Sequence, residues 1–138
     1  MNEAAEVAST CASGIRLQRQ IVLIAGGAGG IGRSCTTAFS AAGAQVIVAD
    51  AMSAEGTHAP AVHTIQCDVT READVMRMFA EALERHGRLD ALVNCVGVLE
   101  PVARTVDQEL SAWERVIAVN LKAAFLLCRC RCSRGRCS

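Results

Sequence analysis

Several features are missing from the 138-residue sequence, and each absence excludes a class of protein. No apolar run approaches the about 20 residues that a membrane-spanning helix needs. The N-terminal segment has neither a basic start nor an apolar block, so we expect no secretory signal. The formal net charge of +0 does not indicate a nucleic acid or a membrane as partner. Tyrosine is absent, which excludes a phenol as general acid or base.

Cysteine, by contrast, is abundant, with eight residues in total. Such a count would indicate a disulfide scaffold in a small secreted protein. Apart from Cys11, the isolated cysteines have apolar neighbours, where cysteine behaves as a small hydrophobic residue: Cys35, Cys67 and Cys95. We therefore expect reduced thiols and a cytoplasmic protein.

The other cysteines are interleaved with arginines at the end of the chain, in CRCRCSRGRCS. Their thiolates could bind a metal ion, but the C-x-C-x-C spacing differs from the usual C-x₂₋₄-C spacing of zinc sites. The arginines by themselves would suit a nucleic acid. We predict neither partner, no metal site, and an irregular Arg/Cys-rich tail over residues 129–138.

A strand, a glycine-rich turn and a helix follow one another from Ile21 to Ala42. The run IVLIA is typical of a parallel strand that is buried on both faces. The glycines would let the backbone approach a pyrophosphate, and the amides at the start of the helix would favour its negative charge. We predict that this unit binds a dinucleotide through five residues: Gly26, Gly29, Gly30, Ile31 and Gly32.

An acidic residue, Asp50, ends the next predicted strand, 18 positions after Gly32. This separation is close to the ~20 residues expected for a carboxylate that accepts hydrogen bonds from the adenosine ribose. A carboxylate there would also repel a ribose 2′-phosphate. The sequence therefore favours NAD over NADP, while a simple turn-capping role for Asp50 stays open.

Three further strands are predicted at Gln45–Ala49, Val62–Cys67 and Leu89–Val96. A polar loop over residues 51–60 joins the first two of these, and helical segments are predicted after the glycine turn, after Cys67 and after Val96. Alternating strands and helices indicate an α/β fold with a doubly wound parallel sheet, here an incomplete Rossmann-type sheet of about four strands. We expect the strand order 3-2-1-4. The expected organisation is a flexible leader over residues 1–19 and a partial NAD-binding domain over residues 20–128.

Several side chains after residue 57 can be assigned to the core or the surface from the sequence pattern. We expect Thr70 to cap a helix whose apolar positions include Met76, Met78 and Phe79, all in the core. His63 and His58 have no patterned partner in the sequence, so we expect both at the surface. A second, longer helix is predicted over residues 107–128.

The order of these motifs resembles that of the short-chain dehydrogenases/reductases. The segment AGGAGGIG, residues 25–32, is similar to their TGxxxGxG cofactor turn. Asp50 stands where NAD-preferring members have an acidic residue. Asp68 and Val69 match the Asp-Val pair that contacts adenine in this family.

Two more motifs extend the resemblance, which covers residues 20–128. NCVG, from Asn94 to Gly97, is similar to the family's NNAG motif. The resemblance implies that Asn94 and Gly97 lie near the cofactor. Asn120 matches the helix asparagine that supports a proton relay to the catalytic lysine. The resemblance implies an oxidoreductase that moves hydride between nicotinamide and a secondary alcohol or ketone.

The sequence also departs from the family pattern. Ala25 stands where threonine is usual, and Cys95 and Val96 replace Asn and Ala in the second motif. The family's catalytic serine and Tyr-x-x-x-Lys pair are not found, because tyrosine is absent and the only lysine, Lys122, is preceded four positions earlier by Ala118.

Three interpretations follow from this mixture. The first is a short-chain oxidoreductase in a truncated, inactive form, since the composition changes abruptly after Cys128. The alternatives are a non-catalytic dinucleotide-binding module and a non-functional truncated product. The helix over residues 107–128 is a candidate homo-oligomer interface, and we predict no membrane partner.

Overall fold

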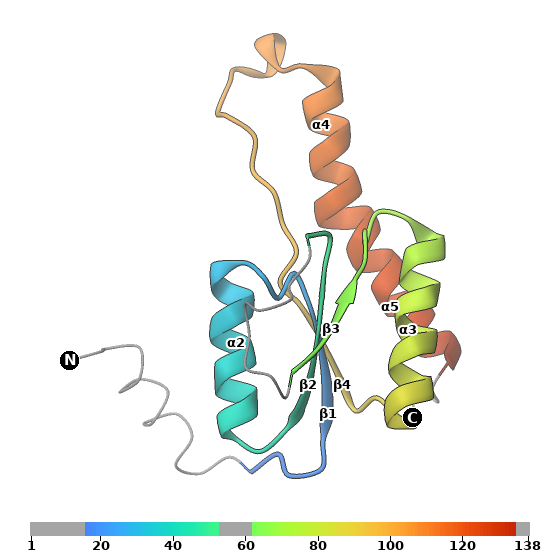
Figure 1. Ribbon diagram of the computed structural model, residues 1–138. Coiled ribbons are helices and arrows are strands. Elements are labelled where there is room, and N and C mark those ends of the chain that lie inside the picture. Colours follow the sequence, from blue (N-terminus) through green and yellow to red (C-terminus); the bar gives the residue numbers. More distant parts are fainter. Residues whose placement is uncertain (1–15, 53–61, 135–138) are drawn as a thin grey trace, which may run out of the picture.

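The computed structural model describes residues 16–52 and 62–134, which form one parallel sheet with helices on both faces (Figure 1). The sheet order is β3-β2-β1-β4, as predicted. The strands are β1 (Ile21–Ala25), β2 (Gln45–Asp50), β3 (His63–Gln66) and β4 (Ala91–Asn94). Helix α2 (Gly30–Ala41) covers one face, and α3 (Glu72–His86) and α5 (Ala123–Arg134) cover the other.

Strand β1 is apolar at every position, and β2 is apolar from Val46 to Ala49, because both faces of these strands are covered. All five residues of β1 are buried. Leu23 and Ile47 face the α3 and α5 side, whereas Val22 and Val48 belong to the cluster under α2. Since side chains alternate along a strand, two cores require a continuous apolar run rather than an alternating one.

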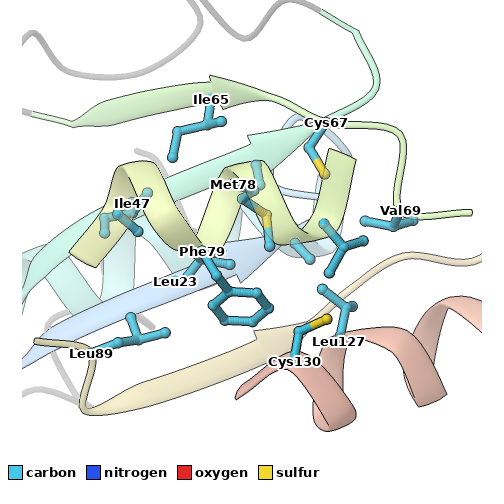
Figure 2. Packing of buried hydrophobic residues seen from close by; sticks show 14 of the residues in the cluster. Leu23, Ile47, Ile65, Cys67, Val69, Met78, Phe79, Leu89, Leu127 and Cys130 are labelled. Atoms are coloured by element: carbon cyan, nitrogen blue, oxygen red, sulfur yellow. The ribbon is translucent and has the colours of Figure 1, made fainter. Parts of the chain in front are cut away.

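The larger core lies between the sheet and helices α3 and α5 (Figure 2). Met78 and Phe79 from α3 are almost completely buried there, as expected. The prediction for Met76 was wrong, because its side chain is 42% exposed. At about 100° per residue, position 76 lies about 110° from the middle of the buried face of α3, which consists of Val75, Met78, Phe79 and Ala82.

Two further expectations about this region were wrong. Thr70 does not cap α3, since the N-cap residue is Arg71 and has no side-chain cap bond. His63 is 9% exposed, with Nδ1 lying 3.2 Å from His86 Nε2 and Nε2 lying 3.3 Å from Glu81 Oε1. The partners of His63 come from the far end of α3, so sequence neighbours gave no signal. His58 lies outside the described residues.

The long helix predicted over residues 107–128 is divided and shifted. A 3₁₀ turn (Thr105–Asp107) precedes α4 (Leu110–Ile117), and a π turn (Ala118–Lys122) joins α4 to α5. Helix α5 continues to Arg134, so residues 129–134 are helical and not irregular as predicted.

Contacts with distant segments explain why α5 extends this far. Cys130 is buried in the larger core, next to Leu127 in Figure 2. Arg131 Nη2 donates a hydrogen bond to the backbone oxygen of Leu89 (2.5 Å), and Arg129 forms an ion pair with Glu72. The interleaved arginines thus reach polar partners on either side while Cys130 fills an apolar position.

At the other end, the chain contacts the domain from Leu17 onward. The backbone N–H of Leu17 donates to Ala42 O (2.8 Å), so part of the expected flexible leader is bonded to the end of α2. Residues 1–15 lie outside the described residues. Within the described ranges, none of the helices has the length and apolar character required to cross a membrane.

Candidate functional site

The glycine turn between β1 and α2 is held in place by close backbone packing. Gly26 has a φ of +78°, and a Cβ atom on it would lie 2.8 Å from the carbonyl carbon of Cys95. A Cβ on Gly32 would lie 2.2 Å from Gly26 O. These two glycines are therefore required by the fold itself, because side chains would collide with backbone.

Gly29 and Gly30 differ, since packing does not require them. The nearest atom to a Cβ on Gly29 is at 3.7 Å, and a Cβ on Gly30 would meet nothing within 4 Å. Gly29 is the N-cap residue of α2 and supplies no side-chain cap bond. The first amides of the helix have no intrahelical acceptor, so they are available to an anionic group above the turn.

Asp50, at the end of β2, is directed towards this turn by two hydrogen bonds. Its Oδ2 accepts from the backbone N–H of Ala28 (3.0 Å), and its Oδ1 accepts from the N–H of Met52 (3.1 Å). The carboxylate therefore both orders the turn and lies at the same sheet edge. The turn-capping and ribose-binding interpretations are thus compatible, because each oxygen has a second lone pair.

These elements enclose a pocket of about 320 Å³ at the carboxyl ends of the strands. This lies within the ~300–1,000 Å³ common for small-ligand sites. Five of the predicted site residues line it: Gly26, Gly29, Asp50, Val69 and Gly97. The other lining residues were not predicted, although they flank the predicted ones at the strand ends: Ala28, Ala51, Met52, Cys67, Cys95 and Val96.

The remaining predicted residues do not line the pocket. Gly30, Ile31 and Gly32 lie in the first turn of α2, and Ile31 is 74% exposed. The Asn94 side chain turns back on its own loop, where Oδ1 accepts from the N–H of Val96 (3.1 Å).

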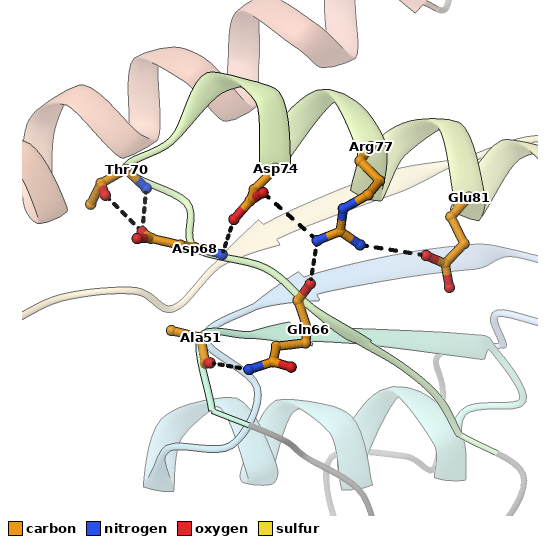
Figure 3. Close-up of polar contacts among 7 residues, drawn as sticks. All are labelled: Ala51, Gln66, Asp68, Thr70, Asp74, Arg77 and Glu81. Carbon is orange, nitrogen blue, oxygen red and sulfur yellow. Dashed lines mark hydrogen bonds and ion pairs between the residues drawn. The ribbon is translucent and has the colours of Figure 1, made fainter.

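Asp68 is likewise occupied by its own loop, as Figure 3 shows. Its Oδ1 accepts from both the backbone N–H (3.0 Å) and the Oγ1 hydroxyl (2.7 Å) of Thr70. These bonds, the hydroxyl bond above all, lower the pKa of Asp68 below its usual value. The carboxylate thereby shapes the loop that presents Val69 to the pocket.

Behind this loop, Arg77 on α3 connects several polar groups (Figure 3). Its Nη2 donates to Gln66 O (2.8 Å), and its guanidinium lies 3.9 Å from carboxylate oxygens of both Asp74 and Glu81. Because these groups are partly exposed, each ion pair contributes little, and the hydrogen bond to Gln66 ties α3 to β3.

Asn120, in the π turn, binds the segment after β4 through both ends of its amide. Oδ1 accepts from the N–H of Val98 (2.9 Å), and Nδ2 donates to the oxygen of Val98 (3.0 Å). This reciprocal pair positions the chain that follows Gly97.

The thiols at the pocket wall are not activated. Burial raises the pKa of Cys67 to about 11, and burial followed by the neighbouring Cys35 raises that of Cys95. Thiols in this state are poor nucleophiles. Among residues 16–52 and 62–134, no three His, Cys, Asp or Glu side chains are grouped as metal ligands.

Comparison with known proteins adds a family relationship. Residues 20–133 match the family model described as short chain dehydrogenase. Short-chain dehydrogenase reductase 3c of Arabidopsis thaliana is 36% identical in an alignment of 118 residues, which covers 81% of this chain and 46% of that protein. The chain thus spans about half the length of the curated relatives it matches.

Solved structures show the same partial coverage. A putative short-chain dehydrogenase/reductase from Burkholderia xenovorans superimposes with a TM-score of 0.79 and 34% identity, over 87% of this chain and 52% of that one. The 3-ketoacyl-(acyl-carrier-protein) reductase from Brucella melitensis, complexed with NADH, superimposes with a TM-score of 0.75 and 28% identity. The match covers 82% of this chain and 48% of that one.

Proposed function

Because the chain belongs to the short-chain dehydrogenase family, which implies a nicotinamide dinucleotide as cofactor, we propose that the pocket beside the glycine turn holds NAD. The observation that carries this proposal is the open space above Gly29 and Gly30, next to an uncapped helix start. A pyrophosphate there would accept from the amides of Gly30, Ile31 and Gly32.

The choice of NAD over NADP rests on Asp50. Its carboxylate lines the pocket and is oriented by Ala28 and Met52. The free lone pairs would accept from the two ribose hydroxyls, whereas a 2′-phosphate would meet a like charge. Val69 and the Asp68 loop would contact the adenine, and Asn94 and Gly97 would flank the path towards the nicotinamide.

The reaction that the family relationship suggests is hydride transfer between a secondary alcohol or ketone and nicotinamide. The nicotinamide group, when bound, would accept or donate the hydride. The sequence contains no tyrosine that could act as proton donor, and Ala118 stands four positions before Lys122. We therefore propose that it binds the dinucleotide without turnover. A non-functional product is the alternative.

Asn120 is proposed as the relay asparagine, although its contacts also give it a purely structural task. One amide hydrogen and one lone pair are used by Val98, which leaves a second donor and a second acceptor for a proton path. A cytoplasmic location is also proposed, because the isolated cysteines Cys35, Cys67 and Cys95 lie among apolar neighbours in the sequence and do not suggest a disulfide scaffold.

The interface proposal concerns the exposed apolar side chains along residues 107–128. Leu110, Trp113, Leu121 and Phe125 are each more than half exposed. A pocket of about 430 Å³ lies beside Trp113, between α4 and the segment before it. Such a stripe favours association with a second copy.

Calorimetric titration with NAD, NADP and ADP-ribose tests the site. We expect NAD and ADP-ribose to bind and NADP to bind more weakly. Gly30→Leu should abolish binding without loss of thermal stability, because its Cβ would meet only open space and leucine favours a helix. The control Ser40→Ala lies at the exposed far end of α2. Unchanged NAD binding by Gly30→Leu would exclude this site.

A further inference from the structure

Two thiols from distant parts of the chain meet beside the pocket. The Cys95 thiol donates a hydrogen bond to Cys35 Sγ, and the sulfur atoms lie 4.0 Å apart across 60 positions of sequence. Cys35 belongs to α2, and Cys95 directly follows β4. Both side chains are half-buried against the sheet face formed by Val22 and Ile24.

We propose that Cys35 and Cys95 form a reversible intrachain disulfide under mild oxidation, joining α2 to the end of β4 at the pocket wall. A disulfide needs about 2 Å between the sulfur atoms, so each has to move by about 1 Å, which rotation of half-buried side chains can supply. The link requires no bound nucleotide.

The backbones that carry the two thiols are already held in place. The N–H of Cys95 donates to Ala25 O (2.8 Å), at the end of the central strand. Cys35 lies one turn inside α2, whose start is fixed by the packing of Gly32 against Gly26. The dithiol is therefore preorganised, and the link would constrain the backbone on which Gly26 packs.

The reaction balances with a low-molecular-weight disulfide as oxidant. Cys35 loses its proton to solvent and attacks one sulfur of the reagent, which breaks the S–S bond of the reagent and forms a mixed disulfide on Cys35; the first thiolate leaves and takes up a proton. Cys95 then loses its proton to solvent and attacks Cys35 Sγ, which releases the second thiol. The two cysteines lose two electrons and two protons, which reduce the reagent to two thiols. Because its pKa is raised, Cys95 should react faster as the pH increases.

Treatment of the full chain with glutathione disulfide tests the proposal. After alkylation of the remaining thiols, trypsin and a Glu-specific protease place Cys35 in residues 34–55 and Cys95 in residues 89–104, with Cys67 on a separate fragment. We expect these two fragments to be joined as the main intrachain cross-link. Dithiothreitol should separate them.

Two variants complete the experiment. Cys35→Ser should abolish the cross-link, and Cys128→Ser, which removes an exposed thiol on α5, should leave it unchanged. The oxidised chain should melt at least about 4 °C higher, since the link closes a long loop. Glutathione adducts without the cross-link, or Cys35 joined mainly to another cysteine, would overturn the proposal. If Cys35→Ser does not fold, the cross-linked fragments of the oxidised parent chain still show whether Cys35 and Cys95 are joined.

Discussion

The carboxylate of Asp50 accepts a hydrogen bond from the backbone N–H of Ala28, 3.0 Å away, and so joins the end of β2 to the glycine turn after β1. This bond places the acidic side chain of Asp50, which lines the pocket, next to the turn that is proposed to hold the pyrophosphate. The relative position of the two proposed contacts is thereby set by the protein before any ligand binds.

Replacement of Asp50 should affect both NAD binding and the turn. Asp50→Ala should weaken NAD binding by about 1.5–3 kcal/mol, the range for hydrogen bonds to a charged group, and should weaken NADP binding less. Calorimetry on both proteins measures the difference. Asp107→Ala, which removes an exposed carboxylate paired with Arg104, is the matched control. Equal NAD affinity in all three proteins would remove Asp50 from the site.

The purified chain should show no dehydrogenase turnover with a panel of alcohols or ketones. The sequence has no tyrosine, and a general acid or base normally contributes ~10²–10⁴-fold. Absorbance of NADH over time, against a heat-treated sample, measures this. A steady enzyme-dependent change would contradict the prediction and would require another proton donor.

The contribution of α5 to stability can be isolated with two leucines near the same helix. Leu127 is fully buried and Leu121 is 63% exposed. Leu127→Ala should lower the free energy of unfolding by about 2–5 kcal/mol, since it leaves a cavity in the larger core. Leu121→Ala should change it by less than about 0.5 kcal/mol, as exposed positions usually do. Urea denaturation compares them, and similar effects would mean that α5 does not pack as described.

The contact between His63 and His86 should make stability depend on pH. Burial, followed by the neighbouring His63 and Arg85, lowers the pKa of His86, so the folded chain favours its neutral form. The unfolded chain binds the proton more readily, and stability should therefore fall as the pH drops below the usual histidine pKa of about 6.5. Denaturation of the parent and of His86→Gln between pH 8 and 5 tests this. A parallel pH dependence in both proteins would show that His86 does not contribute.

The free edge and the exposed helix should make the isolated chain associate. In the described part of the chain, β4 pairs only with β1, and Figure 1 shows α4 projecting beyond the sheet. We expect marginal stability, aggregation or self-association, and only a small increase in melting temperature with NAD. Light scattering should show less association for Trp113→Glu than for Glu109→Gln. A monodisperse parent monomer that melts above ~60 °C would contradict this.

Local sequence patterns were sufficient for the sheet and for the glycine turn. The continuous apolar run of β1 predicts burial on both faces, and helices follow β1, β3 and β4. These signals indicate a doubly wound parallel sheet, and the order β3-β2-β1-β4 is the order expected for that type of sheet. Asp50 could be placed at the pocket for the same reason, since it ends a strand of that sheet.

The tertiary structure alone decided those features that depend on residues far apart in the sequence. Helix α5 extends through Arg131, where Arg129 pairs with Glu72 and Arg131 donates to the backbone oxygen of Leu89. Both partners lie far away in the sequence, so no local pattern predicts them. His63 is buried because Glu81 and His86 reach it from α3. The meeting of Cys35 with Cys95 has the same origin. Periodicity reports which face of an element is apolar, whereas hydrogen bonds and thiol contacts depend on which elements the fold brings together.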